Sequence, residues 1–332
     1  MMRLLVLTNN PSRASFRQRI GNHLEALRRD GINSEVAKIP SAEWARFRLF
    51  KTAADFDCVF LHKKILNALD AFWLRRYAKA LIYDFDDAIM YYDKNPQRRP
   101  SRHKHTNPFR RTVKLAGIVI AGNSYLAQHA KKFNRNVVIL PTALDTKIYN
   151  LQIKPQSDGK IRLVWIGSKS TLKYLAEIKP ALEKIGADFT NVVLRIICDE
   201  FFDLRNMQVE KCPWSLETQV KDLATADIGL APLPDNRFTR GKCGFKALQY
   251  AAAGLPAVAS PVGVNAEYVL DGVTGYHASR ISQWVEKISE LVRDIDLREK
   301  MGRQAAMNAK QYDITIIGNK LVELIKKNIV PS

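Results

Sequence analysis

Residues 240–260 read Arg-Gly-Lys-Cys-Gly-Phe-Lys-Ala-Leu-Gln-Tyr-Ala-Ala-Ala-Gly-Leu-Pro-Ala-Val-Ala-Ser. Apolar residues recur at helical spacing over residues 245–253, which predicts a helix. The Gly-Leu-Pro that follows ends this helix, and the small apolar residues after it predict a short strand. Gly241 and Gly244 stand where the helix begins. A glycine turn that opens a helix exposes backbone N–H groups and the positive end of the helix dipole, and both favour a bound phosphate.

The same turn carries two cationic side chains, Lys242 and Lys246, beside those N–H groups. Another glycine turn, Gly-Val-Asn at residues 263–265, follows the short strand. A second interpretation is an ordinary helix–strand unit whose glycines only cap and turn. Spacing by itself leaves both interpretations open.

The composition is that of a soluble protein with two globular domains. The chain has 332 residues, of which 46% are hydrophobic, and its sequence holds no run of about 18 apolar residues. The N-terminus reads as a first strand, with an apolar run too short for a signal peptide. The four cysteines are scattered without metal-ligand spacing, which predicts a cytoplasmic location and no metal site.

Positive charge is concentrated in the first half of the chain. The net charge is +19; residues 1–150 carry 27 Lys and Arg against 12 Asp and Glu, and residues 151–332 carry 25 against 21. Residues 94–114 hold eight Lys and Arg and no acid. Such a field attracts nucleic acid, anionic lipid or phosphorylated substrates. Because no recognised nucleic-acid fold signature is visible, we expect an anionic membrane surface as partner and no nucleic acid.

Strand-like and helix-like segments alternate along the chain. This alternation predicts an α/β protein with two Rossmann-like, doubly wound parallel sheets. We place the first domain at residues 1–152, a polar, turn-rich linker at 153–159, and the second domain at 160–312.

Polar side chains follow two predicted strands of the first domain. His62 ends one buried strand, and Asp84, Asp86 and Asp87 lie at the end of the next. Sites in parallel sheets lie at the carboxyl ends of strands. Crowded acids at such an end indicate acid–base work, hydroxyl binding or a metal. Helix capping and loop acids are the alternative.

Three arginines, Arg13, Arg17 and Arg19, lie in the loop after the first strand. Arginines facing a cleft suit a phosphorylated acceptor or a donor pyrophosphate, and a solvated basic loop is the alternative. In the second domain, the turn Gly167-Ser168-Lys169 follows the first strand and opens a helix. Its N–H groups and its lysine form a second candidate phosphate site.

The helix, Gly-Leu-Pro stop and small-residue strand of residues 245–260 resemble the donor-binding segment of GT-B glycosyltransferases of family 4. That segment usually reads Glu, seven residues, Glu, then Ala-Met-Ala-x-Gly-x-Pro-Val-Val-Ala. Here Gly241 and Gln249 stand in place of the two glutamates, and the Gly-Lys-Cys-Gly-Phe-Lys…Gln form resembles a variant branch. The resemblance covers residues 3–325.

The resemblance implies two domains that face a cleft, with a C-terminal helix at 313–332 packed back on the first domain. It implies that Lys169 and Lys242 hold the donor pyrophosphate and that Gln249 binds ribose hydroxyls. The donor-binding residues are expected to be Gly167, Ser168, Lys169, Trp214, Gly241, Lys242, Cys243, Gly244, Phe245, Gln249, Gly263, Val264 and Asn265. The catalytic residues are expected to be Asp86, Asp87 and Lys242. The acceptor-binding residues are expected to be Arg13, Arg17, Arg19, His62 and Asp84.

The activity that the resemblance implies is sugar transfer with retention from a nucleotide-sugar, such as a UDP- or GDP-sugar, without a metal or other cofactor. The expected acceptor is a saccharide or lipid-linked saccharide of the cell envelope, and the expected location is the inner face of the membrane. A nucleotide-sugar epimerase of GT-B fold, a non-catalytic polyanion-binding protein and a degenerate, inactive subunit remain as alternatives.

Overall fold

The computed structural model describes residues 1–92, 95, 97–149 and 158–329. The chain forms two compact units. The first unit comprises Met1–Leu144, Asn236–Cys243 and Tyr312–Ser332, and the second comprises Asp145–Asp235 and Gly244–Gln311.

A six-stranded sheet in the order β2-β1-β3-β4-β5-β6 forms the centre of the first unit. Every pairing in it is parallel. The strands are β1 (Met2–Thr8), β2 (Ile32–Lys38), β3 (Cys58–His62), β4 (Leu81–Phe85), β5 (Ile118–Ala121) and β6 (Val137–Ile139). β3 and β4 are buried over their whole length, as expected for parallel strands that helices cover on both faces.

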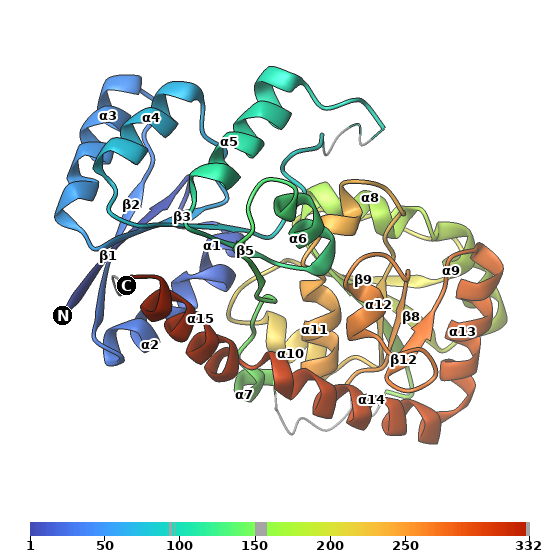
Figure 1. Ribbon diagram of the computed structural model, residues 1–332. Coiled ribbons are helices and arrows are strands. Elements are labelled where there is room, and N and C mark those ends of the chain that lie inside the picture. Colours follow the sequence, from blue (N-terminus) through green and yellow to red (C-terminus); the bar gives the residue numbers. More distant parts are fainter. Residues whose placement is uncertain (93–94, 96, 150–157, 330–332) are drawn as a thin grey trace. The chain divides into compact units, whose positions relative to one another are not determined.

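Helices cover both faces of this sheet, as Figure 1 shows. One face packs against α1 (Ala14–Arg19), α2 (Leu24–Arg29) and the C-terminal α15 (Ile314–Ile329). The other face packs against α3 (Glu43–Thr52), α4 (Ala68–Tyr77), α5 (Asn107–Leu115) and α6 (Ser124–Lys131). Because α15 belongs to this unit, the end of the chain packs in the same unit as its beginning.

The second unit contains a parallel six-stranded sheet in the order β12-β11-β10-β7-β8-β9. Its strands are β7 (Ile161–Ile166), β8 (Val192–Ile197), β9 (Gln208–Cys212), β10 (Ile228–Ala231), β11 (Ala257–Ala259) and β12 (Gly275–His277). The longer helices are α8 (Lys169–Ala176), α9 (Lys179–Asp188), α10 (Gln219–Ala224), α11 (Phe245–Ala252), α13 (Ile281–Arg293) and α14 (Ile295–Ala309). Short helices are α7 (Thr146–Tyr149) and α12 (Asn265–Tyr268).

One core of the second unit lies between the sheet and helices α8, α9 and α13. Helix α11 lies on the opposite face, where the ring of Tyr250 fits against Gly229 of β10. A Cβ at Gly229 would come within 2.5 Å of that ring, so the close approach requires glycine. The predicted pair of doubly wound parallel sheets is confirmed; that they face one cleft stays a prediction.

Each sheet has a point where the strand order reverses. It lies between β1 and β3 in the first unit and between β7 and β10 in the second. The second order is that of a dinucleotide-binding sheet. In open α/β sheets, ligands bind outside the carboxyl ends of strands at this reversal. The residues at these positions are Thr8 and His62 in the first unit and Gly167 in the second.

Contrary to our prediction, the three arginines do not all lie in a loop. Arg13 precedes helix α1, which begins at Ala14 and ends at Arg19, so Arg17 and Arg19 are helical. After a short 3-10 turn, α2 begins at Leu24. The break between the helices comes at Ile20, whose φ of −141° is not helical, and both Arg19 and Ile20 are buried there.

The N-terminal part of the first unit ends at Leu144. The unit also includes Asn236–Cys243, a segment that we had placed in the second domain. Most of the predicted linker, residues 150–157, lies outside the described residues. Within the described part of the chain, no helix is both long enough and apolar enough to cross a bilayer.

Candidate functional site

Two side chains meet at the strand reversal of the first sheet. Thr8 ends β1 and His62 ends β3, and Oγ1 of Thr8 lies 3.1 Å from Nδ1 of His62. His62 is buried, and burial lowers the pKa of its imidazole despite nearby carboxylates. Its Nε2 has no hydrogen-bond partner among the described residues. The arrangement keeps a neutral imidazole at the predicted edge of the sheet.

Arg19 and Asp84 pair with each other in the interior. Arg19 Nη2 donates to Asp84 Oδ1, Nε donates to Oδ2 at 3.3 Å, and Nη1 donates to the carbonyl of Leu140 at 2.7 Å. Both side chains are only 1% exposed. This pair ties the end of α1 to β4, and its burial argues against the direct acceptor contact that we expected of both residues. Arg13 is exposed before α1, and Arg17 is half-buried on it.

Lys63 bridges the two acids that follow β4. Its Nζ lies 2.9 Å from Oδ1 of Asp86 and also donates to Oδ2 of Asp87. Lys63 has a φ of +55°, and its N–H donates to the carbonyl of Asp84 at 2.7 Å. A positive φ in a residue other than glycine is uncommon and clusters at functional sites. The backbone here is bent so that the ammonium reaches both carboxylates.

Asp86 is a buried carboxylate held in its ionised form. Burial by itself would raise its pKa, but the positive charges of Lys63 and Arg19 outweigh burial and lower it. Nζ of Lys63 lies 2.9 Å from Oδ1 of Asp86, and this ion pair keeps the carboxylate charged although it is buried.

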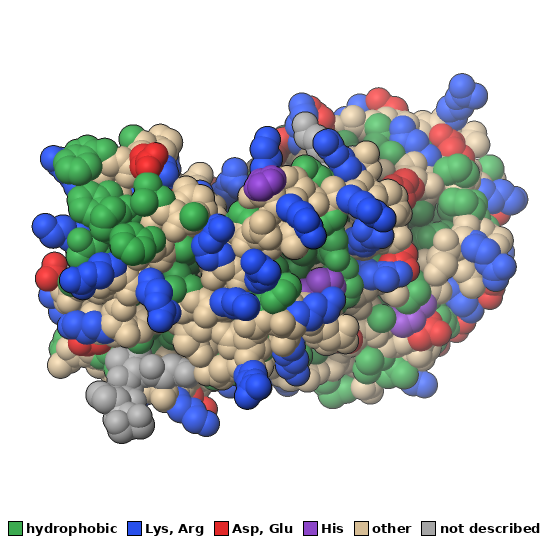
Figure 2. All heavy atoms as spheres, turned by 45° about the horizontal axis from the view of Figure 1, so that its top comes forward, with side chains coloured by type: hydrophobic (Ala, Val, Ile, Leu, Met, Phe, Trp, Pro, Cys, Tyr) green, Lys and Arg blue, Asp and Glu red, His purple; other side chains and the backbone are tan. Residues whose placement is uncertain are grey.

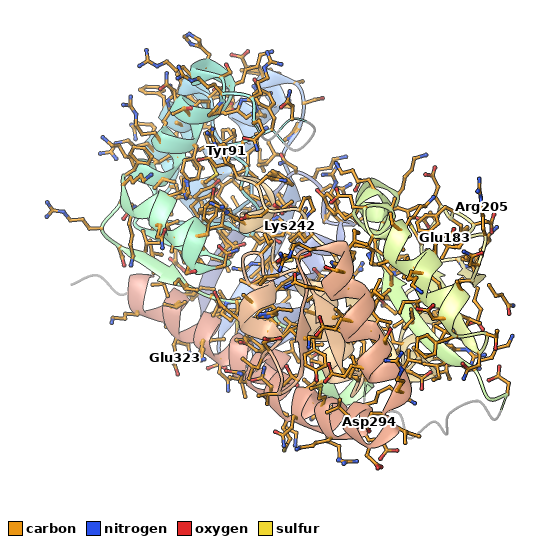
Figure 3. All side chains as sticks on the ribbon, turned by 90° about the vertical axis from the view of Figure 1, so that its right-hand side faces the viewer. Tyr91, Glu183, Arg205, Lys242, Asp294 and Glu323 are labelled. Carbon is orange, nitrogen blue, oxygen red and sulfur yellow. The ribbon has the colours of Figure 1, made fainter. Side chains whose placement is uncertain are left out.

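Lys242 joins this cluster from a distant part of the sequence. The segment Asn236–Cys243 belongs to the first unit, and Nζ of Lys242 lies 3.9 Å from Oδ1 of Asp87; Lys242 is labelled in Figure 3. Asn123, the N-cap of α6, donates to the carbonyl of Lys242 at 3.2 Å. The predicted catalytic residues Asp86, Asp87 and Lys242 are thus brought together.

Gly241 lies against the same unit. A Cβ there would come within 2.7 Å of the Cβ of Ala88 and 2.9 Å of Leu126. Since real Cβ atoms do not approach that closely, a glutamate at this position would not fit without movement of the backbone. The packing explains why glycine stands where the family pattern has its first glutamate.

The first glycine turn of the second unit has the predicted geometry. Gly167 follows β7, and a Cβ there would come within 2.6 Å of the Trp165 ring. Ser168 then caps α8, with its N–H donating to Oγ1 of Thr171 at 3.2 Å. Lys169 begins α8 with an exposed side chain that pairs with Glu200. The turn presents an accessible helix N-terminus with a lysine.

The second glycine turn lies before α11. Gly244 has a φ of +61° and caps the helix, and a Cβ there would come within 2.6 Å of Val264. Gly263 also has a positive φ, of 56°. Asn265 is buried and donates to the carbonyl of Ala231 at the end of β10. The turn before α11 and the 263–265 turn therefore lie together, as predicted. Phe245 and Cys243 are half-buried on either side of Gly244.

Gln249 lies in a buried chain of hydrogen bonds on α11. Its Nε2 donates to Oη of Tyr149 at 3.0 Å and to Oε1 of Gln219 at 3.3 Å. Trp214, which is partly exposed, donates from Nε1 to the same Gln219 oxygen at 3.3 Å. Both N–H groups of Gln249 are therefore used inside the protein, and its carbonyl oxygen is the group suited to a ligand hydroxyl.

Residues 147–294 match the family model described as Glycosyl transferases group 1. This match covers somewhat less than half of the chain. The matched residues include the Gly167 turn, the Gly244 turn and Gln249.

This chain is similar to a curated relative over a short segment and to solved structures over most of its length. D-inositol 3-phosphate glycosyltransferase of Paenarthrobacter aurescens (strain TC1) is 33% identical over 90 residues, which are 26% of this chain and 21% of that relative. The chain thus matches about a fifth of the length of this curated relative. The structure of Anabaena HepE with UDP and glucose has a TM-score of 0.73 and 16% identity, covering 98% of this chain and 100% of that one.

A second similar structure is that of WaaG. WaaG, a glycosyltransferase involved in lipopolysaccharide biosynthesis, has a TM-score of 0.70 and 16% identity, covering 97% of this chain and 99% of that one. At these identities the structural likeness supports the fold. The substrates of this protein must be inferred from its own residues.

The sequence interpretation did not single out four residues of the candidate site. Thr8 and Lys63 stand at the ends of β1 and β3, where the strand-end rule would have found them. Tyr149 and Gln219 are visible only through their contacts with Gln249. No group of three or more His, Cys, Asp or Glu that could hold a metal occurs in residues 1–92, 95, 97–149 and 158–329.

Proposed function

We propose that the protein transfers a sugar from a nucleotide-sugar donor to an acceptor hydroxyl with retention at the anomeric carbon, using no metal. The observation that carries the proposal is the group 1 family match, because residues 147–294 contain both glycine turns and Gln249. The bound UDP and glucose of the Anabaena relative support a uridine nucleotide as the first donor to test.

The donor binds on the second unit in this proposal. Its pyrophosphate lies at the N-terminus of α8, where N–H groups and Lys169 supply positive charge. Gln249 accepts a hydrogen bond from a ribose hydroxyl through its carbonyl oxygen, since its N–H groups already bind Tyr149 and Gln219. The partly exposed indole of Trp214 lies at the end of the same hydrogen-bond chain and suits contact with the base.

The first unit supplies the groups for the chemical step. The bond between the anomeric carbon and the phosphate oxygen breaks, and its electron pair stays on the diphosphate. Lys242 stabilises this charge. Asp86 accepts a hydrogen bond from a sugar or acceptor hydroxyl, and its lowered pKa makes it an orienting group and a weak base. The acceptor oxygen then bonds to the anomeric carbon on the face that the diphosphate leaves, and its proton passes to the departing diphosphate.

We assign a saccharide or lipid-linked saccharide of the cell envelope as acceptor, and the inner face of the membrane as the location. The basic first unit supports this assignment, because a phosphorylated or lipid-linked acceptor carries negative charge. The lipopolysaccharide role of WaaG supports the same class. The arginines of the first loop contribute through Arg13 and Arg17, which are not fully buried.

The first experiment measures thermal stability with UDP, GDP and ADP and with their sugars. A ligand at 100 times its Kd stabilises the folded state by about 2.7 kcal/mol, so the correct nucleotide is recognised by its shift. Nucleotide release is then measured with lipid-linked and soluble acceptors. Release that requires an acceptor supports transfer, whereas conversion of the donor sugar without acceptor indicates an epimerase. The proposal fails if no nucleotide shifts the melting temperature.

Replacing Lys242 by Ala tests the assignment of the chemical step. Removal of one preorganised charge stabiliser lowers turnover by roughly 100-fold. Lys300→Ala, an exposed lysine of the second unit, serves as the matched control and should keep full turnover. Unchanged turnover in the Lys242 variant would remove this residue from the mechanism.

A further inference from the structure

Helices α3 and α4 expose a row of large apolar side chains, which we name the aromatic ridge: Trp44, Phe47, Leu69, Phe72 and Trp73. Trp44 is 62% exposed, Phe72 58% and Leu69 41%. The rings form a continuous series, with centroids 5.5 Å apart for Trp44–Phe47, 4.6 Å for Phe47–Trp73 and 5.0 Å for Phe72–Trp73. Figure 2 shows a hydrophobic patch on this unit with Lys and Arg side chains, and also acidic side chains, around it.

A basic groove adjoins the aromatic ridge. The ridge surrounds a pocket of about 520 Å³ that is lined by Trp44, Phe47, Leu69 and Trp73 and by one acid, Glu43. Between α4 and α5 lies a groove of about 390 Å³ that contains Arg75, Arg110, Arg111 and Lys114, and Phe72 is shared with the ridge. No acidic side chain is found among the described residues that line this groove. An apolar surface and an uncompensated cationic surface therefore share α4.

The fold does not require the exposed rings of the ridge. Phe50 of α3 and Leu74 of α4 are fully buried against the sheet and supply the core contacts of these helices. The two helices are braced by an ion pair, in which Nε of Arg46 lies 2.8 Å from Oδ1 of Asp70. Contiguous exposed apolar surface on a rigid support marks an interaction site rather than incomplete packing.

We propose that the aromatic ridge and the adjoining basic groove dock the first unit on an anionic lipid bilayer. Tryptophan and phenylalanine insert at the boundary between headgroups and acyl chains, and cations beside them attract anionic headgroups. A nucleic acid would need free ring faces for base stacking. Trp44 instead already stacks on Phe47 and has the guanidinium of Arg48 4.8 Å from its ring centroid.

The position of the aromatic ridge on α3 and α4 determines which edge of the sheet would lie at the membrane. α3 follows β2 and α4 follows β3. The first turns of both helices therefore lie toward the carboxyl edge of the sheet, the edge that carries His62 and Lys63. Docking would bring this edge to the membrane surface, where a lipid-linked acceptor resides. That consequence rests on the proposed function, whereas the docking itself does not.

The test measures binding of the protein by co-sedimentation with vesicles of phosphatidylcholine alone and with about 30% phosphatidylglycerol, whose anionic headgroups attract nearby cations. The aromatic variant is Trp44→Ser/Phe72→Ser, and its control is Ile295→Ser/Met307→Ser, two residues of the second unit that are 59% and 52% exposed. We expect the aromatic variant to bind the anionic vesicles about tenfold more weakly. The control should bind like the wild type.

The charge variant is Arg75→Gln/Arg110→Gln/Lys114→Gln, and its control is Arg205→Gln/Lys221→Gln on the second unit. Each groove cation removed should weaken binding about fivefold, and 0.5 M salt should have the same effect on the wild type. Circular dichroism checks that every variant is folded. Tryptophan emission should shift to shorter wavelength on anionic vesicles in a Trp214→Phe background and lose that shift when Trp44 and Trp73 are also replaced by Phe.

Two outcomes would overturn the proposal. One is binding to anionic vesicles that the aromatic variant leaves unchanged. The other is tighter, salt-sensitive binding to single-stranded DNA that is weakened by the charge variant, with no binding to vesicles; this result would identify a nucleic-acid surface. Because vesicle binding is measured without donor or acceptor, its failure is distinguishable from failure of sugar transfer.

Discussion

Replacing Arg19 by Met tests the buried ion pair of the first unit. The substitution keeps most of the side-chain volume and removes three donated hydrogen bonds, two to Asp84 and one to the carbonyl of Leu140. Both charged side chains are 1% exposed, so water cannot replace the lost partner. Leaving one member of a buried pair alone costs about 3–5 kcal/mol of folding free energy. We expect a loss near the middle of that range.

The assay is urea unfolding followed by far-UV circular dichroism, with Arg17→Met as the matched control on the same helix. Arg17 is only half-buried, and its replacement should cost less than about 1 kcal/mol. The double variant Arg19→Met/Asp84→Leu removes both charges and should recover most of the stability, since an apolar pair can replace a buried ion pair at little cost. The cycle should therefore show a coupling energy of about 2 kcal/mol or more.

The contrary result is equally clear. If Arg19→Met unfolds at the same urea concentration as Arg17→Met and raises KM for the acceptor instead, Arg19 faces the substrate. That outcome would restore the role expected from the loop of three arginines and refute the assignment of a buried structural pair.

Three further predictions concern the cluster and the turns. Lys63→Met should lower turnover roughly 100-fold and move the acid limb of the kcat/KM profile to higher pH. Lys63 lowers the pKa of Asp86, so without Lys63 this carboxylate becomes ionised only at higher pH. An acid limb that stays at the same pH would contradict the ion pair. Gly241→Ala should destabilise the protein by about 1–3 kcal/mol in thermal unfolding, because its Cβ overlaps neighbouring atoms; an unchanged melting temperature would show that the segment packs elsewhere. Gln249→Glu removes two donated hydrogen bonds and should lower the free energy of unfolding in urea by about 2 kcal/mol. A variant that is more stable and binds the donor more tightly would show that the protein does not need the hydrogen bonds donated by Gln249.

Local sequence patterns predicted the elements well where the physics is local. Alternating apolar segments and helical periodicity led to two parallel sheets, because burial of both faces imposes a pattern on each strand. The glycine turns at Gly167 and Gly244 were predicted from their place between strand and helix. Gly244 indeed adopts the left-handed conformation that favours glycine.

Predictions failed or were incomplete where the partner of a residue lies far away in sequence. We predicted Arg19 to be solvated or to face the substrate, because nothing in the loop sequence indicates that it pairs with Asp84, which lies 65 residues later. Lys63 could have been found from its place at the end of β3, but its pairing with Asp86 and Asp87 could not. The interpretation of Gly241 as a phosphate turn did not anticipate its close contact with Ala88.

The sequence alone determined the fold class, the two glycine turns and the strand ends at which polar residues gather, since these follow from backbone conformation and from periodic burial within a few residues. Only the tertiary structure decided which of the gathered residues pair with each other. It buried Arg19 with Asp84, joined Lys63 and Lys242 to Asp86 and Asp87, and engaged both N–H groups of Gln249. The physical reason is that charge neutralisation and hydrogen bonding depend on distances of a few ångströms between strands, which no spacing along one strand can specify.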